Sequence, residues 1–281
     1  MHARQVLRKA WSVLRRNDTR FLVLLPITRP PDLLGFSVES IQRQKEKDFE
    51  VHIISDGAPE ETNLRIASLC RKDSRLTSHV FAKGNRNGEY YRDPIIRDSR
   101  ASYVCQIADD DVWFPDHLTE IGRLLATCDF GNTIQTEAAP GFRLLPLLGD
   151  IADPATAQRM LTEAFNIFGP TASGYTRVTY LRLEKGWEAA PNDVWSDLFM
   201  WRKFLARADI KRRSRFAFTN LHISVPHHRG MSLGERGIIN REWSEIVSDE
   251  RKLDELKQCL LRHVAIRPST DAWARFDPKS G

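Results

Sequence analysis

The sequence predicts an α/β fold, a Rossmann-like and mostly parallel sheet flanked by helices, followed by a helical C-terminal extension. Between about residues 21 and 136, short apolar and β-branched runs alternate with segments of helical periodicity, a pattern typical of strands joined by crossover helices. Acidic residues follow two of these runs, and an open α/β sheet binds its ligands at the carboxyl ends of its strands. No internal repeat interrupts the pattern, so we expect one main domain.

Strands and helices are expected in alternation along the first half. A buried strand at 21–25 is halted by Pro26, and the segment 31–45 carries its apolar residues on one helical face. A strand over 49–55 then ends in a turn signal that begins at Asp56. The remaining elements expected in this half are a helix at 62–70, a weaker strand at 76–81, a strand at 103–108 and a helix at 116–127.

The second half is less regular and begins with a loop-rich stretch near Ala138. Asp153 followed by Pro154 is typical of an N-cap with proline at the first helical position, which predicts a helix to about residue 165. Further along we expect a helix at 196–208, a strand at 216–225 and a helical tail at 243–264. The chain is therefore divided into a segment at 1–20, a main domain at 21–235 with halves at 21–137 and 138–235, and a helical extension at 236–281.

The composition is that of a globular protein. The 281 residues are 41% apolar, which suffices for a sizeable core. No apolar run approaches the roughly 20 residues of a membrane-spanning helix, and the first residues lack the long apolar centre of a signal peptide. The four cysteines are scattered, without the spacing of a metal clip or a redox pair, so we expect reduced thiols in a cytoplasmic protein.

The first 16 residues are basic and amphipathic. Such a pattern predicts a short helix that either packs on the body of the protein or contacts a membrane surface. We therefore expect a cytoplasmic protein, either free or peripheral on the inner membrane face. The net charge of +5 suits an anionic ligand, a membrane surface or nucleic acid equally well.

Three adjacent carboxylates, Asp109, Asp110 and Asp111, follow the strand expected at 103–108. Carboxylates so close together repel one another when they are partly desolvated, and a divalent cation removes that repulsion. A cation such as Mg²⁺ or Mn²⁺ takes one or two carboxylates and completes its shell with phosphate oxygens and water. The residues thus indicate a site for a metal-bound phosphate ester, and the alternative is a solvated acidic loop that caps the next helix.

The segment 103–118, Tyr-Val-Cys-Gln-Ile-Ala-Asp-Asp-Asp-Val-Trp-Phe-Pro-Asp-His-Leu, resembles the D-x-D segment of family 2 glycosyltransferases. Upstream, Pro26, the run Ser-Ile-Gln-Arg-Gln at 40–44 and the segment 49–57 also resemble the opening pattern of that family. The resemblance covers about residues 21–207 and rests on several motifs in the same order. It implies the GT-A fold, an inverting mechanism and a nucleotide-sugar donor, with the donor in the half 21–137 and the acceptor and catalytic groups in 138–235.

The resemblance also implies roles for the acidic residues. Asp56 would contact the nucleoside, Asp109 the ribose, and Asp110 a Mn²⁺ or Mg²⁺ ion that bridges the diphosphate, with Asp111 next in line as a metal ligand. Family members often read D-x-D-D before the aromatic residue, which would place Ala108 at the first acidic position.

Two basic stretches are expected to add donor contacts. By the resemblance to that family, the loop after the first strand should contact the donor, and in this chain it supplies Pro26, Thr28 and Arg29. This chain departs from the family here, because it has Thr-Arg-Pro at 28–30 where many members have Tyr-Asn-Arg. A glycine-punctuated loop at 83–92 precedes the strand at 103–108 and lacks the P-loop pattern. From this loop and the residues after it, Lys83, Arg92 and Arg97 are the candidates to contact the nucleotide or its diphosphate, and a solvated turn is the alternative.

The segment 191–202 resembles the late acidic motif of the family and supplies the expected catalytic base, Asp197. Ser196 as N-cap would place Asp197 in the first helical turn, where the helix dipole would lower its pKa. Simple helix capping is the alternative role, and Asp193 is the reserve candidate. His228, in the run 227–229, would be an extra metal ligand, although a late histidine is more often structural.

These observations predict an inverting, hexosyltransferase-type enzyme that moves a sugar from a nucleoside diphosphate sugar, with a UDP-sugar as the first candidate. The acceptor would be a saccharide or glycolipid in surface polysaccharide or glycolipid synthesis. A non-catalytic nucleotide-sugar-binding scaffold of a polysaccharide-assembly complex is the alternative. A nuclease or nucleotidyltransferase is disfavoured because the basic residues are dispersed, so no nucleic-acid partner is expected.

Overall fold

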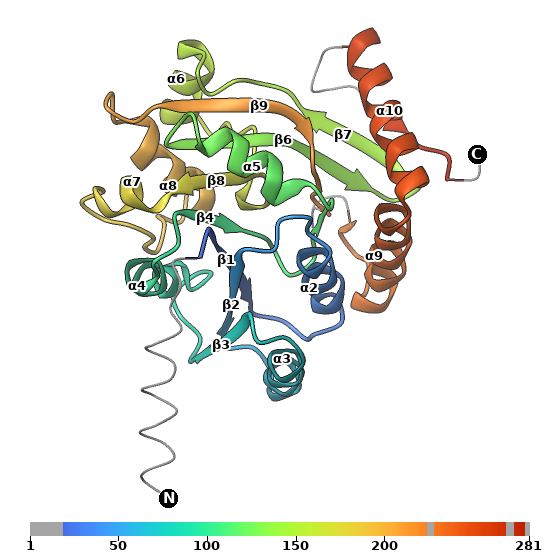
Figure 1. Cartoon of the computed structure of the whole chain (residues 1–281), viewed down its shortest axis with the longest axis horizontal. Helices are drawn as coiled ribbons and strands as arrows, with labels where there is room; N and C mark the ends of the chain where they lie inside the picture. The colour runs from blue at the N-terminus through green and yellow to red at the C-terminus, as the bar shows by residue number, and fades with distance from the viewer. Residues whose placement is uncertain (1–18, 224–227, 268–272, 279–281) are drawn as a thin grey trace, which may run out of the picture.

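The computed structural model describes residues 19–223, 228–267 and 273–278, and it has a mixed central sheet with helices on both faces (Figure 1). The strands lie in the order β11-β7-β6-β8-β4-β1-β2-β3, and β9 pairs with β6 outside this path. The basic segment expected at the N-terminus, with its proposed membrane contact, lies almost entirely outside the described residues.

The first half forms the parallel part of the sheet. Its strands are β1 (Phe21–Ile27), β2 (Phe49–Asp56), β3 (Leu76–Phe81) and β4 (Tyr103–Gln106). They are connected through α2 (Leu34–Gln42), α3 (Glu60–Lys72), the short η1 (Glu89–Tyr91) and α4 (Arg92–Asp98). The expected strands and the first two helices are confirmed, except that Pro26 does not end β1, which continues to Ile27 in register with β2.

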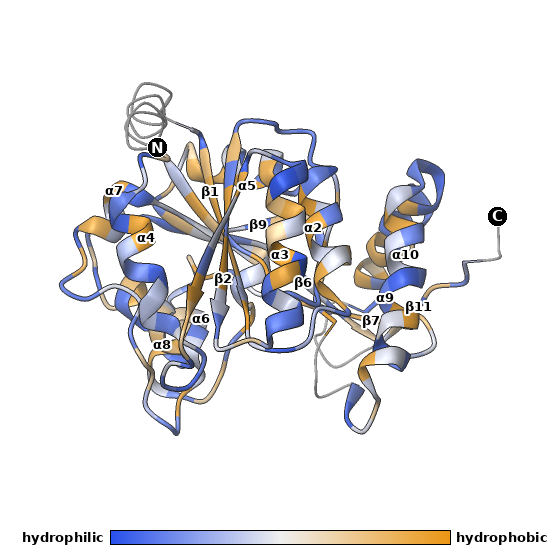
Figure 2. Cartoon of the chain, turned by 90° about the horizontal axis from the view of Figure 1, so that it is seen from below, coloured by the Kyte–Doolittle hydropathy of each residue, from blue (hydrophilic) through white to orange (hydrophobic). Residues whose placement is uncertain are grey.

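The apolar run of β1 is explained by burial on both faces of the sheet. Leu22 and Leu24 pack into a core with α4 and α8, whereas Phe21, Val23 and Leu25 pack on the other side with α2 and α5. Figure 2 shows α4, α6 and α8 on one side of the sheet and α2 and α3 on the other. The carboxyl ends of β1 and β4 are thereby held between two packed helical layers.

The second half continues the same sheet. After β5 (Val112–Trp113) and α5 (His117–Leu125) come β6 (Phe130–Ala139), β7 (Arg143–Leu147), α6 (Pro154–Thr162), η2 (Pro170–Ala172), β8 (Ser173–Thr176), α7 (Arg177–Leu181), α8 (Ser196–Leu205), β9 (Arg212–Phe218) and β10 (Asn220–Leu221). β8 is inserted antiparallel between β4 and β6. The strands β6, β7 and β8 were not predicted, whereas Asp153 caps α6 as expected, accepting a hydrogen bond from the Thr156 amide.

The C-terminal extension consists of α9 (Leu233–Ser248), α10 (Glu250–Ile266) and β11 (Ala274–Arg275). The predicted single tail is therefore two helices, which break at Asp249, the N-cap of α10. The predicted strand at 216–225 is also wrong in its limits, because β9 begins at Arg212 and ends at Phe218. Apolar residues of α9 and α10, among them Trp243 and Leu256, share a core with β6, β7 and β9.

The four cysteines are free, two of them buried and two partly buried. No helix among the described residues is long and apolar enough to span a membrane.

Candidate active site

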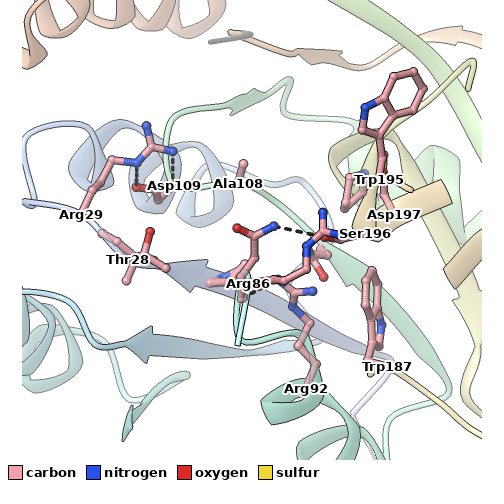
Figure 3. A pocket seen from close by; sticks show the side chains of 15 residues that line it. Thr28, Arg29, Arg86, Arg92, Ala108, Asp109, Trp187, Trp195, Ser196 and Asp197 are labelled. Atoms are coloured by element: carbon pink, nitrogen blue, oxygen red, sulfur yellow. Dashed lines mark hydrogen bonds and ion pairs between the residues drawn. The ribbon is translucent and has the colours of Figure 1, made fainter. Parts of the chain in front are cut away.

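A pocket of about 400 Å³ lies at the carboxyl ends of β1 and β4, where polar residues were expected to gather. One end is formed by the residues that follow β1 and β4, including Thr28, Arg29 and Asp109. The other end is formed by Trp187 and the first residues of α8, including Asp197 (Figure 3). The structure thus brings the predicted base into one cavity with five of the predicted donor residues, which are Pro26, Thr28, Arg29, Arg92 and Asp109.

Asp109 lies at the first end of this pocket and is paired with Arg29. The Nη2 atom of Arg29 donates to Oδ1 of Asp109 at 2.9 Å, and its Nε atom lies 2.9 Å from Oδ2. Burial and the neighbouring charge of Asp110 raise the pKa of Asp109 to about 7, although Arg29 opposes this rise. Burial would lower the pKa of Arg29, but Asp109 and Asp110 raise it. Pro26, Thr28 and Arg29 all line the pocket.

Asp110 is buried and forms ion pairs with two arginines. Arg236 of α9 donates to its Oδ2 atom at 2.5 Å, and Nη1 of Arg29 lies 3.2 Å from the same oxygen. Asn240, one turn further along α9, donates to the backbone carbonyl of Asp110 at 2.7 Å. Sequence reasoning missed Arg236 and Asn240 because they lie in the C-terminal extension, 126 and 130 residues from Asp110.

Asp111 faces the interior and not the pocket. The amide of Ile223 donates to its Oδ1 atom at 2.8 Å, and Nδ1 of His222 and the hydroxyl of Thr171 donate to its Oδ2 atom. Burial alone would lower the pKa of His222, but the Asp111 carboxylate raises it to about 10, so the ring is protonated at neutral pH. Asp111 therefore anchors the chain around His222 in this structure, and its predicted role as a metal ligand stays a prediction.

The predicted metal ligands do not form one cluster. No three histidine, cysteine, aspartate or glutamate side chains of the described ranges are arranged to hold a metal ion, so Asp110, Asp111 and His228 are not brought together. Asp109 and Asp110 remain, and two carboxylates are what Mg²⁺ or Mn²⁺ takes from a protein when phosphate oxygens and water complete its shell. By their chemistry these two residues fit such an ion, although in this structure Arg29 and Arg236 occupy their oxygens.

Asp56 and Lys83 contact each other but do not line the pocket. Nζ of Lys83 lies 2.6 Å from Oδ2 of Asp56, and the amide of Gly84 donates to Oδ1 at 2.5 Å. Gly88 has φ +59°, and a Cβ atom there would lie 2.6 Å from Cγ of Asp56. Asp56 therefore holds the loop at 83–88 in place. Neither its predicted contact with the nucleoside nor that of Lys83 with the donor is supported by this arrangement.

The two other predicted basic residues differ in position. Arg97 lies outside the pocket and pairs with Asp93 at 2.8 Å on the exposed side of α4. Arg92 lines the pocket, is only 4% exposed and lies over the ring of Trp187 at 4.6 Å. Burial lowers the pKa of Arg92, and the negative charges of Glu89 and Asp56 oppose this shift, although neither carboxylate forms an ion pair with it among the described residues. Arg92 is therefore a buried cation that faces the cavity.

A basic loop connects the two ends of the pocket. Arg86, in the left-handed conformation with φ +53°, donates to the carbonyls of Ala190 and Pro191. Nδ2 of Asn87 donates to the hydroxyl of Ser196 at 3.1 Å. The loop that Asp56 anchors is thereby fastened to the start of α8. Sequence reasoning did not single out Arg86 or Asn87.

Asp197 lies in the first turn of α8, as expected, but its surroundings differ from the prediction. The N-cap is Trp195, and the hydroxyl of Ser196 donates to Glu89, so Ser196 does not cap the helix. The Leu198 amide donates to Oδ1 of Asp197 at 2.9 Å, and Asn166 donates to Oδ2 at 2.8 Å. Burial raises the pKa of Asp197, whereas the helix dipole was expected to lower it.

A carboxylate with a raised pKa that lines a cavity is suited to accept a proton. The reserve candidate, Asp193, is exposed and does not line the pocket.

Comparison with known proteins agrees with this arrangement. Residues 23–136 match the family described as Glycosyl transferase family 2, which confirms the predicted resemblance for that segment. The chain is 28% identical over 102 residues to an uncharacterized glycosyltransferase of Rickettsia felis and 29% identical over 101 residues to one of Rickettsia bellii. These matches cover 36% of this chain but only 16% and 14% of the relatives, so the chain spans a small part of their length.

Solved structures confirm the predicted GT-A fold over most of the chain. The crystal structure of S. aureus TarS 1–349 in complex with UDP-GlcNAc aligns with 88% of this chain and 73% of its own, with a TM-score of 0.53 and 14% identity. The mannosyltransferase PcManGT of Pyrobaculum calidifontis, in complex with GDP-Man and Mn²⁺, aligns with 90% of this chain and 77% of its own, with a TM-score of 0.53 and 13% identity.

Proposed function

We propose that this chain is an inverting glycosyltransferase that moves a sugar from a nucleoside diphosphate sugar to an acceptor hydroxyl. The observation that carries the proposal is the single pocket with Asp109 and Arg29 at one end and Asp197 at the other. The family match over residues 23–136 supports the reaction class. The donor class is supported by the solved structures, which bind UDP-GlcNAc and GDP-Man.

The donor binds at the end of the pocket that follows β1 and β4. Pro26 and Thr28 contact the nucleoside, and the guanidinium groups of Arg29 and Arg92 interact with the negative charge of the diphosphate or with the base. A UDP-sugar is the first candidate, because TarS was solved with UDP-GlcNAc. A hexosyl group is the transferred unit in this proposal.

Asp109 and Asp110 would hold Mn²⁺ or Mg²⁺ at the diphosphate. When bound, the ion neutralises the charge that develops on the departing nucleoside diphosphate. Arg236 and Arg29 balance the two carboxylates in the absence of the donor. The bound Mn²⁺ of PcManGT supports the choice of ion.

Asp197 acts as the general base. It accepts the proton of the acceptor hydroxyl while the hydroxyl oxygen attacks the anomeric carbon, and the bond to the diphosphate oxygen breaks on the opposite face, so the configuration inverts. Its raised pKa makes the carboxylate a stronger base than an exposed aspartate. The acceptor is a saccharide or glycolipid, as in the synthesis of surface polysaccharide or glycolipid.

A thermal-shift screen of UDP-, GDP- and dTDP-sugars, with and without Mn²⁺, tests the proposal. We expect one nucleotide series to raise the melting temperature, with a larger rise in the presence of Mn²⁺, because a ligand that binds only the folded state stabilises it. Slow release of free sugar from the same donor would then distinguish an enzyme from a non-catalytic scaffold. The absence of any shift across the panel would contradict the proposal.

A further inference from the structure

Trp195 is the one exposed large apolar side chain, within the described ranges, that lines the pocket. It is 53% exposed, whereas Trp113 and Trp201 are fully buried and Trp187 is 3% exposed. A lone exposed ring on an open surface needs no explanation. This ring, however, lies at the rim of the cavity, two residues before Asp197, and Figure 3 shows it at the same end of the pocket.

The backbone around Trp195 is held on two sides. Its carbonyl accepts the first hydrogen bond of α8, from the Phe199 amide at 2.9 Å. Arg86 and Asn87 fasten the preceding loop and the next residue, Ser196, to the opposite wall of the pocket. The ring is therefore presented from a fixed position, and a ligand that stacks on it does not have to order a loop first.

The surroundings of the ring are polar. Asn192 and Asp193 are exposed just before it, and Arg86, Asn87 and Ser196 line the pocket beside it. A lipid chain would require a contiguous apolar surface, and these polar side chains interrupt the apolar surface that Pro170 and Trp187 add to the pocket. A pyranose ring has one face of C–H groups and a rim of hydroxyl groups, so it matches a single aromatic ring with polar neighbours.

We propose that Trp195 is a stacking platform for a sugar ring of the acceptor, so that the acceptor is a saccharide whose reacting hydroxyl lies at Asp197. The inference rests on the proposed function, because it assigns this end of the pocket to the acceptor. It adds that the part of the acceptor beside the general base, Asp197, is a sugar ring. The donor lies at the other end, beside Arg29 and Asp109, and does not need the ring.

Saturation-transfer NMR on the full chain with bound UDP tests this inference. The probes are the methyl β-pyranosides of glucose, galactose, mannose and N-acetylglucosamine. We expect transfer to the axial C–H protons of at least one probe. Its affinity should fall about tenfold in Trp195→Ala and remain close to the wild-type value in Trp195→Phe, because stacking requires only an aromatic face. Phe216→Ala removes an exposed ring far from the pocket lining and is the matched control, with no expected change.

Two results would overturn the inference. Either none of the four pyranosides binds the UDP-loaded wild type, or Trp195→Ala binds the responsive probe as well as the wild type does. Binding of UDP is measured by thermal shift on the same samples. It shows whether a negative pyranoside result concerns only the stacking platform or also the donor site. If UDP binds every variant while the pyranoside result is negative, the stacking platform is wrong and the donor site stands. If neither UDP nor GDP nor dTDP binds the wild type, the proposed function itself fails.

Discussion

The two ends of the pocket differ in how their charges are balanced. At the donor end, Asp109 and Asp110 form ion pairs with Arg29 and Arg236, and Asp111 accepts hydrogen bonds from His222 and its neighbours. At the acceptor end, Asp197 accepts hydrogen bonds from an amide and an asparagine, and it forms no ion pair among the described residues.

This difference separates carboxylates that arginines neutralise in the absence of a ligand from a carboxylate that has no such partner. A buried carboxylate with an arginine partner is costly to disturb, because removal of the partner leaves an uncompensated charge. An ionisable group without an ion-pair partner has a shifted pKa and is available to a ligand. We therefore expect mutations at the donor end to affect folding as well as donor binding, and mutations at the acceptor end to affect turnover with little loss of stability.

The largest expected effect is on turnover in Asp197→Asn. The amide keeps the size of the side chain but cannot accept the proton, so the transfer rate should fall about 10²- to 10⁴-fold. Stability and UDP binding should remain unchanged, because no ion pair is lost. Asp193→Asn, at an exposed acidic residue four positions earlier, is the control and should retain the wild-type rate. Wild-type turnover in Asp197→Asn would mean that another group is the base.

A smaller effect, on stability, is expected for Arg236→Met. The change leaves the buried Asp110 with only the longer contact to Arg29, which should cost about 3 kcal/mol in the free energy of unfolding. Denaturant unfolding measures it, and Mn²⁺ should stabilise the variant more than the wild type because the carboxylate is freed. Arg251→Gln removes an exposed pair with Glu255 on α10 and should change the stability by less than about 0.5 kcal/mol. Equal losses in the two variants would contradict the structural role of the ion pair between Arg236 and Asp110.

Arg92→Met should reduce nucleotide affinity with little effect on folding. The apolar side chain replaces a buried cation that forms no ion pair among the described residues. The charges of Glu89 and Asp56 act on it from further away, so the loss of stability should be smaller than that of Arg236→Met. We expect nucleotide binding, measured by calorimetry, to weaken about tenfold, the typical effect of losing one charge-assisted hydrogen bond. A stability loss as large as that of Arg236→Met would show that Arg92 has a structural partner after all.

The smallest expected effect is a shift in pH dependence. Asp197 must be ionised to accept a proton, and burial raises its pKa, so the turnover number should be lost as the pH falls through a value above the usual 3.9 or so. The hydrogen bond from Asn166 stabilises the ionised form, and Asn166→Ala should move this loss of turnover to a higher pH. The measurement is made at a saturating concentration of the donor, so that protonation of Asp109, which would weaken donor binding, does not change the observed rate. A loss of turnover at the same pH in Asn166→Ala as in the wild type would contradict this assignment of Asn166.

Local sequence patterns predicted the donor half of the fold well. The strands β1 to β4 and the helix with Leu34, Val38 and Ile41 on its buried face follow from apolar periodicity over short ranges. The strand β8 was missed because its four residues, Ser-Gly-Tyr-Thr, carry no alternating apolar pattern, and its place between β4 and β6 is set by contacts distant in sequence.

The site was predicted less completely, for a related reason. Residue type and position after a strand identified Asp109 and Asp110 as candidates, and the resemblance to the late acidic motif identified Asp197. The partners of these carboxylates, however, come from other parts of the chain. The orientation of Asp111 depends on His222, and the charge of Asp110 is balanced by Arg236 from α9. The direction of the pKa shift of Asp197 depends on burial, which the helix dipole argument could not include.

The most direct test of the central claim is the anomeric configuration of the sugar released when water is the acceptor. We would incubate the wild type with UDP-GlcNAc and Mn²⁺, or with the donor that gives the largest thermal shift, and follow the anomeric proton by NMR from the first minutes. The account predicts that an α-linked donor first yields the β-anomer, and that Asp197→Asn binds the donor without releasing sugar. Initial release of the α-anomer, or undiminished release by Asp197→Asn, would contradict it.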